Sequence, residues 1–154
     1  MRTHGSVVAD VLLVEGDPED VALFRRALGD LPGRLHVVAG GPEAIDSLRA
    51  QLPALVLVNS RTPGVVDALL KAIADVRQAR RLPLPIHVFG PPVSEPTLRD
   101  MYRLCSAYTV IPEQRDRYAQ VVRFALDYWL NRTLLPPPPH GTGTPDLPES
   151  SPGE

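Results

Sequence analysis

Residues 54–59 of this chain read ALVLVN, an apolar run that ends in an amide, and the run from 54 to 58 predicts a strand. Four further short runs predict strands at 7–14, 35–39, 86–89 and 107–111. Their apolar residues are mostly continuous rather than alternating, which is typical of strands buried on both faces. We therefore expect a sheet that is covered by helices on both sides.

Segments of helical period separate the predicted strands. The first helix has Asp17 as its expected N-cap, Pro18 at its first position and Gly29 as its stop. The others carry apolar stripes at 42–48, 66–76, 98–105 and 121–129. Because strand and helix alternate with short links, we predict an α/β three-layer sandwich of the flavodoxin-like kind. Its five-stranded parallel sheet has the order 2-1-3-4-5, and its site lies where the first, third and fourth strands end.

Composition limits the class of protein. A length of 154 residues suits one domain, and 44% hydrophobic against 22% charged residues is typical of a globular core. A net charge of -2 offers no basic surface for nucleic acid, and no apolar stretch is long enough to span a membrane. The first residues lack an apolar signal core, so we expect a cytoplasmic protein. The single cysteine, Cys105, excludes an internal disulfide or a thiolate metal site.

The composition changes beyond Asn131. Residues 136–139 are four prolines, and glycine, threonine, serine and further prolines follow to Glu154. We predict one folded domain at 1–131 and a Pro-rich disordered tail at 132–154. Polyproline II is the conformation that such a run favours, and a ligand for an aromatic groove is the alternative role of the tail.

Three stretches together resemble the receiver domain of bacterial response regulators, the CheY-like family. They are VLLVEGDPED at 11–20, LVLVN at 55–59 with Pro63 and Gly64, and AYTVIP at 107–112. The resemblance covers residues 7–131. Within the family the chain is most similar to stand-alone receivers that partner phytochrome-type histidine kinases, through residues 102–104, 127–130 and 135–136. It implies a role in two-component phosphorelay signal transduction.

The resemblance also places the family's phosphorylation site on this chain, and the acceptor position departs from the pattern. The acceptor falls on Asn59, and an amide is a poor nucleophile at neutral pH. The acidic pair that binds magnesium in the family falls on Glu15 and Gly16, so only Glu15 and the neighbouring Asp17 supply carboxylates. Magnesium needs several hard oxygen ligands, and we expect neither a metal nor another cofactor here.

The two remaining family positions that read out or hold the phosphoryl group also differ. The hydroxyl falls on Gly90, and the lysine falls on Ile111. No lysine occurs after Lys71, so a small shift of the alignment does not restore one. The resemblance therefore implies a pseudo-receiver in which phosphorylation is no longer the input, and we expect no enzymatic activity.

Two side chains of the degenerate site carry hypotheses of their own. Asn59 is interpreted mainly as a polar residue that closes the strand end by hydrogen bonding. Arg61 lies two residues further on, and its guanidinium could pair with Glu15 or Asp17 and hold the switch in one state. A solvent-facing Arg61 is the alternative.

A partner face is the second candidate site that the resemblance implies, and we expect it on the fourth helix, fifth strand and fifth helix. Tyr108 falls on the family's switch aromatic, and beside Gly90 we expect it to keep a fixed rotamer, with ordinary packing as the alternative. A cis bond before Pro112 is predicted. The fifth helix is rich in aromatic residues, as an interface would be, although Trp129 could simply pack on the sheet. The predicted face comprises Met101, Tyr102, Tyr108, Pro112, Tyr118 and Trp129.

Two functions follow from these expectations. The first is a pseudo-receiver that acts by phosphorylation-independent interaction with a histidine kinase or another receiver, and a homodimer is one form that this hypothesis allows. The alternative is a receiver-fold sensor controlled by a small ligand in the remnant pocket at Glu15, Asp17, Asn59 and Arg61. An unrelated enzyme is disfavoured because no nucleophile has an adjacent base, and His87 is expected to be a packed or edge histidine.

Overall fold

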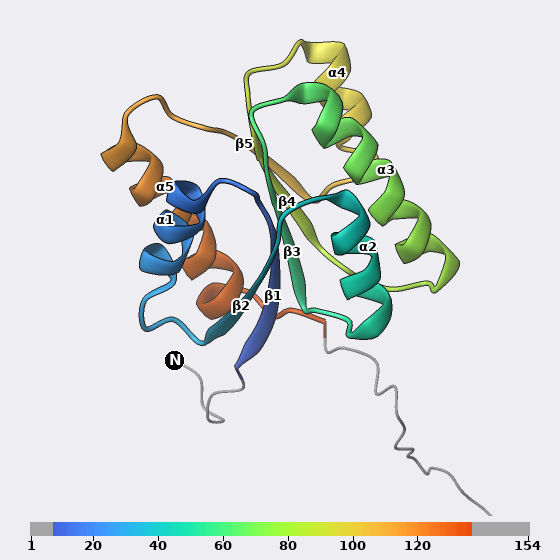
Figure 1. The fold of residues 1–154 in the computed structure, drawn as a ribbon, viewed down its shortest axis with the longest axis horizontal. Helices are drawn as coiled ribbons and strands as arrows, with labels where there is room; N and C mark the ends of the chain where they lie inside the picture. The colour runs from blue at the N-terminus through green and yellow to red at the C-terminus, as the bar shows by residue number, and fades with distance from the viewer. Residues whose placement is uncertain (1–7, 137–154) are drawn as a thin grey trace, which may run out of the picture.

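The computed structural model describes residues 8–136 and confirms the predicted sheet (Figure 1). All strands are parallel, and their order is β2-β1-β3-β4-β5. The strands are β1 (Ala9–Val14), β2 (Gly33–Val38), β3 (Leu55–Asn59), β4 (Ile86–Gly90) and β5 (Ala107–Val110). The helices are α1 (Pro18–Leu28), α2 (Gly41–Ala50), α3 (Pro63–Ala79), α4 (Glu95–Met101) and α5 (Arg115–Asp127), which ends in a π-helical turn, η1 (Tyr128–Arg132).

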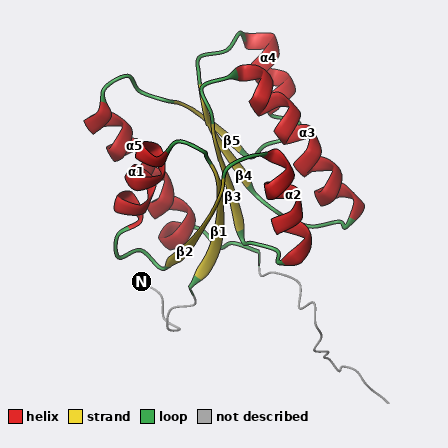
Figure 2. Cartoon of the chain, viewed as in Figure 1, coloured by secondary structure: helices red, strands yellow, loops and turns green. Residues whose placement is uncertain are grey.

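Helices cover both faces of the sheet, as the apolar strands require. Figure 2 shows α1 and α5 on one side and α2, α3 and α4 on the other. β3 and β4 are buried along their whole length, because each lies between neighbouring strands and under helices on both faces. This arrangement fixes the carboxyl ends of β1, β3 and β4 at one edge of the sheet, where the predicted site lies.

The first helix is set by the local signals that predicted it. The side chain of Asp17 caps α1 by accepting a hydrogen bond from the backbone N–H of Glu19 at 3.0 Å. Pro18 stands at the start of the helix, and Gly29 ends it with φ of 49°. Both predicted ends of this helix are therefore confirmed, and α1 packs against α5 across the first core cluster.

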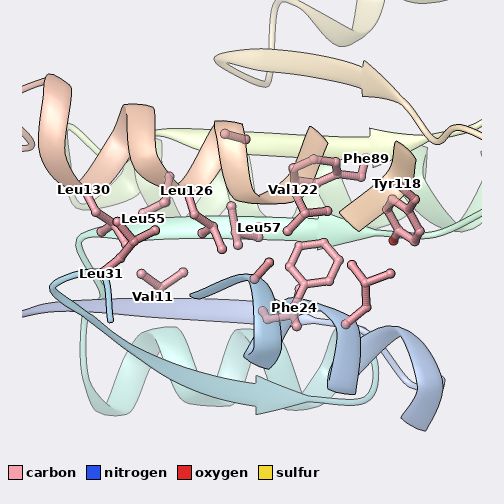
Figure 3. Close-up of a cluster of buried hydrophobic side chains, with 14 of the residues drawn as sticks. Val11, Phe24, Leu31, Leu55, Leu57, Phe89, Tyr118, Val122, Leu126 and Leu130 are labelled. Atoms are coloured by element: carbon pink, nitrogen blue, oxygen red, sulfur yellow. The ribbon is translucent and has the colours of Figure 1, made fainter. Parts of the chain in front are cut away.

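Each face of the sheet has its own hydrophobic core cluster. The first lies under α1 and α5, where the ring of Phe24 meets Phe89 edge-on at 5.3 Å and Tyr118 edge-on at 6.2 Å between centroids. Figure 3 shows Tyr118 at one end of this cluster and Leu130 at the other. The second lies under α2 and α3. Cys105 belongs to this second cluster and is buried as expected, although it lies in the loop after α4.

His87 is a packed histidine, as predicted. It lies in β4, buried, with its ring stacked on Phe89 at 4.4 Å between centroids. Both ring nitrogens are occupied: Nδ1 accepts from the indole N–H of Trp129 at 2.9 Å, and Nε2 lies 2.7 Å from the hydroxyl of Thr109. Trp129 therefore packs on the sheet through its hydrogen bond to His87, which was the alternative to an interface role.

Three further predictions concern the C-terminal tail, the bond before Pro112 and membrane-spanning segments. Packing continues past residue 131, because Leu135 contacts the first core cluster, and the rest of the predicted tail, 137–154, lies outside the described residues. The described residues contain no cis peptide bond, so the predicted cis bond before Pro112 is wrong. The loop forms with the trans isomer, which X-Pro bonds favour. Among the described helices, none is long and apolar enough to cross a membrane.

Candidate functional site: a closed amide and arginine network

The predicted site residues gather at the carboxyl edge of the sheet. Glu15 follows β1, Asn59 ends β3 and Gly90 ends β4. A pocket of about 260 Å³ opens between the ends of β1 and β3 and the start of α2. Glu15, Asn59 and Arg61 line it, together with the backbone of Gly40. The sequence therefore placed these side chains on the correct edge.

Asn59 is the centre of a hydrogen-bond network. Its side chain is only 3% exposed, and its Nδ2 donates to Oε1 of Glu15 and, at 3.2 Å, to Oδ2 of Asp20. Its Oδ1 accepts from the phenol of Tyr118 at 2.7 Å. Because carboxylates only accept while the phenol donates to Oδ1, the network assigns the orientation of the amide. Both amide hydrogens and the amide oxygen are used within the protein.

Asp20 lies beneath this network and is fully buried, at 0% exposure. Each carboxylate oxygen has its own guanidinium: Arg61 Nη1 donates to Oδ2 at 2.6 Å and Arg115 Nη1 donates to Oδ1 at 2.9 Å. Arg115 also donates to the carbonyl of Glu19 at 2.8 Å. Burial raises the pKa of Asp20, but the hydrogen bonds and charges of the arginines outweigh it and lower the pKa below its ordinary value. Asp20 is thus an ionised, charge-paired carboxylate.

Tyr118 joins the arginines to the amide. The guanidinium carbons of Arg61 and Arg115 lie 5.6 Å and 5.9 Å from the centroid of its ring, within cation–π range. Its hydroxyl donates to Asn59, and burial raises the pKa of this phenol well above its ordinary value. Tyr118 therefore stays protonated as a donor. Through it, the start of α5 is fastened to the end of β3.

The predicted ion pair of Arg61 with Glu15 or Asp17 is wrong in its partner. Arg61 pairs with Asp20, which lies in the first turn of α1. Asp17 is occupied in capping α1, and Glu15 accepts from the backbone N–H of Asp17 at 2.7 Å. Burial raises the pKa of Glu15 despite the lowering effect of this N–H and of Asn59.

The residues at the family's metal position do not fit a magnesium ion. Magnesium requires hard oxygen donors in near-octahedral geometry. Gly16 offers no side chain, Asn59 directs its N–H groups rather than its oxygen toward Glu15, and both oxygens of Asp20 are taken by guanidiniums. In the part of the chain that the structure describes, no group of three or more His, Cys, Asp or Glu side chains could hold a metal ion.

The positions of the family's lysine and hydroxyl carry neither a lysine nor a hydroxyl residue. Ile111 is buried in the first core cluster, and Lys71, the only lysine, pairs with Asp67 on α3 at 3.1 Å. At Gly90, the space that a side chain would take is filled by the end of the Tyr108 side chain. Residues 111 and 90 therefore supply no cation and no hydroxyl of their own, and the hydroxyl nearest to Gly90 is the phenol of Tyr108.

The predicted partner face is divided by the structure. Met101 and Tyr118 are 2% and 1% exposed, so these two assignments are wrong: both side chains point into the interior, Met101 into the second core cluster and Tyr118 toward Asn59. Tyr102 is exposed, whereas Tyr108, Pro112 and Trp129 are partly buried.

The sequence analysis did not name several exposed apolar residues, two of which lie on β5 and α5. They are Val110 at the end of β5 and Phe124 on α5, which is 78% exposed. Phe124 lies one helical turn before the exposed Tyr128 and opposite the buried Leu126 and Val122. The phase of the α5 stripe was the signal that could have revealed it.

Several solved structures that match this fold are response regulators. The Mn²⁺-bound form of response regulator Rcp1 matches with a TM-score of 0.72 and 21% identity, over 84% of this chain and 99% of that chain. The phosphorylated cyanobacterial phytochrome response regulator RcpA matches with a TM-score of 0.71 and 24% identity, over the same shares. Response regulator RPA3017, in red light signaling of R. palustris, matches with a TM-score of 0.70 and 20% identity, also over 84% and 99%.

At the level of sequence, neither a family model nor a curated protein matches the chain. The structural matches are below 25% identity but extend over nearly the whole length of each solved receiver. They include the phytochrome-associated receivers that the sequence resembles. The chain has the fold of response regulator receiver domains.

Proposed function

We propose that this protein is a pseudo-receiver of a two-component system, which acts through protein–protein interaction and takes up no phosphoryl group. The receiver fold and its likeness to the red-light response regulators support the two-component setting. The observation that carries the rest is Asn59, a buried amide whose hydrogen-bonding groups are all engaged.

The chemistry of the pocket opposes phosphoryl transfer at three points. The amide oxygen of Asn59 is a weak nucleophile and already accepts a hydrogen bond from Tyr118. The incoming phosphoryl charge would meet the carboxylate of Glu15 beside it, at a site whose residues do not fit a neutralising magnesium ion. The two arginines are held on Asp20, which balances part of their charge. A protein with this pocket binds a partner without catalysing a reaction.

The partner that best fits the setting is a histidine kinase or a true receiver, and a second copy of this chain is the self-associated form of the same hypothesis. The exposed apolar residues beside the end of β5 and on α5 supply contact area for such a partner. They comprise Tyr102, Val110, Phe124 and Tyr128.

A binding experiment tests the proposal. The full chain is used to capture proteins from its own cell lysate with and without acetyl phosphate, alongside Phe124→Ser and the matched surface control Arg49→Ser on α2. Recovery of a histidine kinase or receiver at equal yield under both conditions, reduced by Phe124→Ser only, is expected. Capture that requires acetyl phosphate, or that is unchanged by Phe124→Ser, would contradict the proposal.

A second candidate is a sensor whose partner affinity is set by a small polar ligand. The pocket of about 260 Å³ beside Glu15 and Arg61 favours it, because it is large enough for a small metabolite. Calorimetric titration of a panel of small carboxylates and amines distinguishes the two candidates. Saturable heat that is lost in Arg61→Gln supports the sensor, whereas no saturable heat from any compound removes it.

A further inference from the structure

A second groove lies at the amino edge of the sheet, the edge at which β4 and β5 begin. It has a volume of about 390 Å³ and is lined mainly by leucine and proline side chains. The lining comprises Arg77 of α3, residues 82–85, Ser106, Trp129 and residues 134–136. Because Asn59 ends β3 at the carboxyl edge, this amino-edge groove is separate from the candidate functional site.

Trp129 gives the amino-edge groove an aromatic wall that is held in place. Its indole N–H donates to His87 at 2.9 Å, so the ring is fixed against the sheet while part of it lines the groove. Leu134, on the other side of the ring in sequence from the core residue Leu126, is 97% exposed. An aromatic ring beside exposed leucine and proline is surface that binds extended apolar segments.

Three arginines stand beside the groove without a carboxylate partner. Arg77 donates to the carbonyls of Leu84 and Leu104 at 3.2 Å and 3.0 Å. Arg80 and Arg81 follow α3 directly and precede residue 82 of the groove. None of these three arginines forms an ion pair within residues 8–136. The positive charge beside the groove is therefore available to an acidic ligand.

Arg81 stands where the backbone favours glycine. Its φ is 52°, in the left-handed region, at the turn that closes α3. The N–H of Leu82 donates to the carbonyl of Arg77 at 2.9 Å in this turn. A glycine would adopt the same conformation with less strain, whereas arginine adds a guanidinium next to the groove.

The sequence beyond residue 136 has the chemistry that this groove lacks. Its acidic side chains are Asp146, Glu149 and Glu154, and it contains neither lysine nor arginine. Apart from proline, its one large apolar side chain is Leu147, which lies between the first two carboxylates in the stretch PDLPE at 145–149. The two prolines restrict the backbone of this stretch, which lowers the entropic cost of binding it.

The groove is also where this part of the chain begins, because Pro136 is one of its lining residues. In the polyproline II conformation, residues 137–139 would extend about 9 Å from it. Gly141 and Gly143 follow, and glycine permits the backbone conformations of a reversing turn. A tether this short raises the effective concentration of residues 145–149 at the groove far above that of a free peptide.

We propose that residues 145–149 bind in the amino-edge groove of their own chain. Leu147 would lie against Trp129, and the carboxylates of Asp146 and Glu149 would face the arginines at the end of α3. The bound segment would exclude an acidic, leucine-containing segment of another protein from the same groove. This contact does not depend on the proposed pseudo-receiver function, since it involves no residue of the carboxyl edge.

Paramagnetic broadening in the NMR spectrum of the full chain tests the contact. A nitroxide is attached through Ser150→Cys, because Cys105 is buried and its thiol is shielded from the label. We expect broadening of the amide signals of Leu82, Leu84 and Leu134. It should be lost when Leu147→Ser is added and kept with Thr142→Ser, the matched control in the tether. Absence of broadening at these amides, or broadening that Leu147→Ser leaves unchanged, would overturn the proposal.

Two further measurements separate this contact from other ways of filling the groove. Spin-labelled protein mixed with isotope-labelled parent should leave the parent's signals sharp, whereas broadening there would mean that a second copy supplies the segment and would overturn binding within one chain. Arg81→Gly removes a charge and relieves the backbone, so it should weaken the broadening without loss of stability, and Arg49→Gln on α2 should not. Equal broadening in both variants would refute the role of the arginines.

Discussion

Acidification is expected to destabilise the fold through His87, whose neutral form is built into the core. An indole nitrogen only donates, so Nδ1 of His87, which accepts from Trp129, carries no proton. The single proton of the neutral ring is therefore on Nε2, facing the hydroxyl of Thr109. Protonating Nδ1 would place a positive charge in the core. It would also make Nδ1 a donor that faces the N–H of Trp129, so the hydrogen bond between them would be lost. Burial accordingly lowers the pKa of His87 from 6.5 to about 4.

The sign and size of the effect follow from this difference. The unfolded chain binds the proton with a pKa near 6.5, whereas the folded chain resists protonation down to about 4. Above pH 6.5 the ring is neutral in both states, so the free energy of unfolding is not reduced by His87. As the pH falls from 6.5 toward 4, only the unfolded chain gains the proton, and the free energy of unfolding falls. A difference of about 2.5 pKa units corresponds to roughly 3 kcal/mol in total, of which roughly 2 kcal/mol is lost between pH 7 and pH 5.

The assay is urea unfolding of the parent and of His87→Gln at pH 7 and pH 5. Glutamine keeps a donor and an acceptor but does not titrate, and the other acidic and basic groups titrate in both proteins. We expect the parent to lose about 2 kcal/mol more than the variant over this interval. Equal losses in the two proteins would refute the argument that His87 is held neutral by its burial.

Further predictions concern the network and the exposed face. Asn59→Asp should lower the free energy of unfolding by about 2–4 kcal/mol at neutral pH, because it replaces the donor to Glu15 and Asp20 with a third carboxylate; urea unfolding with Ser60→Ala as control measures this. Adding Gly16→Asp should lower the melting temperature further in chelator, since a Cβ there lies 3.3 Å from the carbonyl of Ala39; a double variant that melts no lower than Asn59→Asp would contradict this. Asp20→Asn should cost about 1–3 kcal/mol in the same assay, because two half-exposed guanidiniums lose their shared carboxylate; a stability like that of the parent would mean that the pairs contribute nothing. Phe124→Ser should change the free energy of unfolding by less than about 0.5 kcal/mol, since the ring is exposed, and a larger loss would place it in the core.

The sheet and the edge that carries the site were predictable because they depend on local pattern. The apolar runs specify buried strands. The ends of these strands bring Glu15 and Asn59 together, and this does not depend on how the helices are rotated. The start of α1 was equally local, because Asp17 and Pro18 are a cap and a first-turn residue. These features need only the chain within a few residues of each site.

The network itself was not predicted, because Asp20, Arg115 and Tyr118 join it from two helices. Which way these side chains face depends on how α1 and α5 are rotated against the sheet. A signal was nevertheless present. Asp20 falls on the apolar stripe of α1 with Phe24, and Tyr118 falls on that of α5 with Val122, so their positions indicated burial rather than exposure. A carboxylate on such a stripe requires a partner, and Arg115 supplies it.

The central claim is that the acceptor site no longer takes up a phosphoryl group. The most direct test is intact-mass analysis of the full chain after incubation with acetyl phosphate and Mg²⁺, beside a receiver that retains the acceptor aspartate. The pseudo-receiver account predicts a phosphoryl adduct on that control and none on this chain. A phosphoryl adduct on this chain that maps to Asn59, or a hydroxylamine-sensitive one that maps to Glu15 or Asp20, would contradict the account.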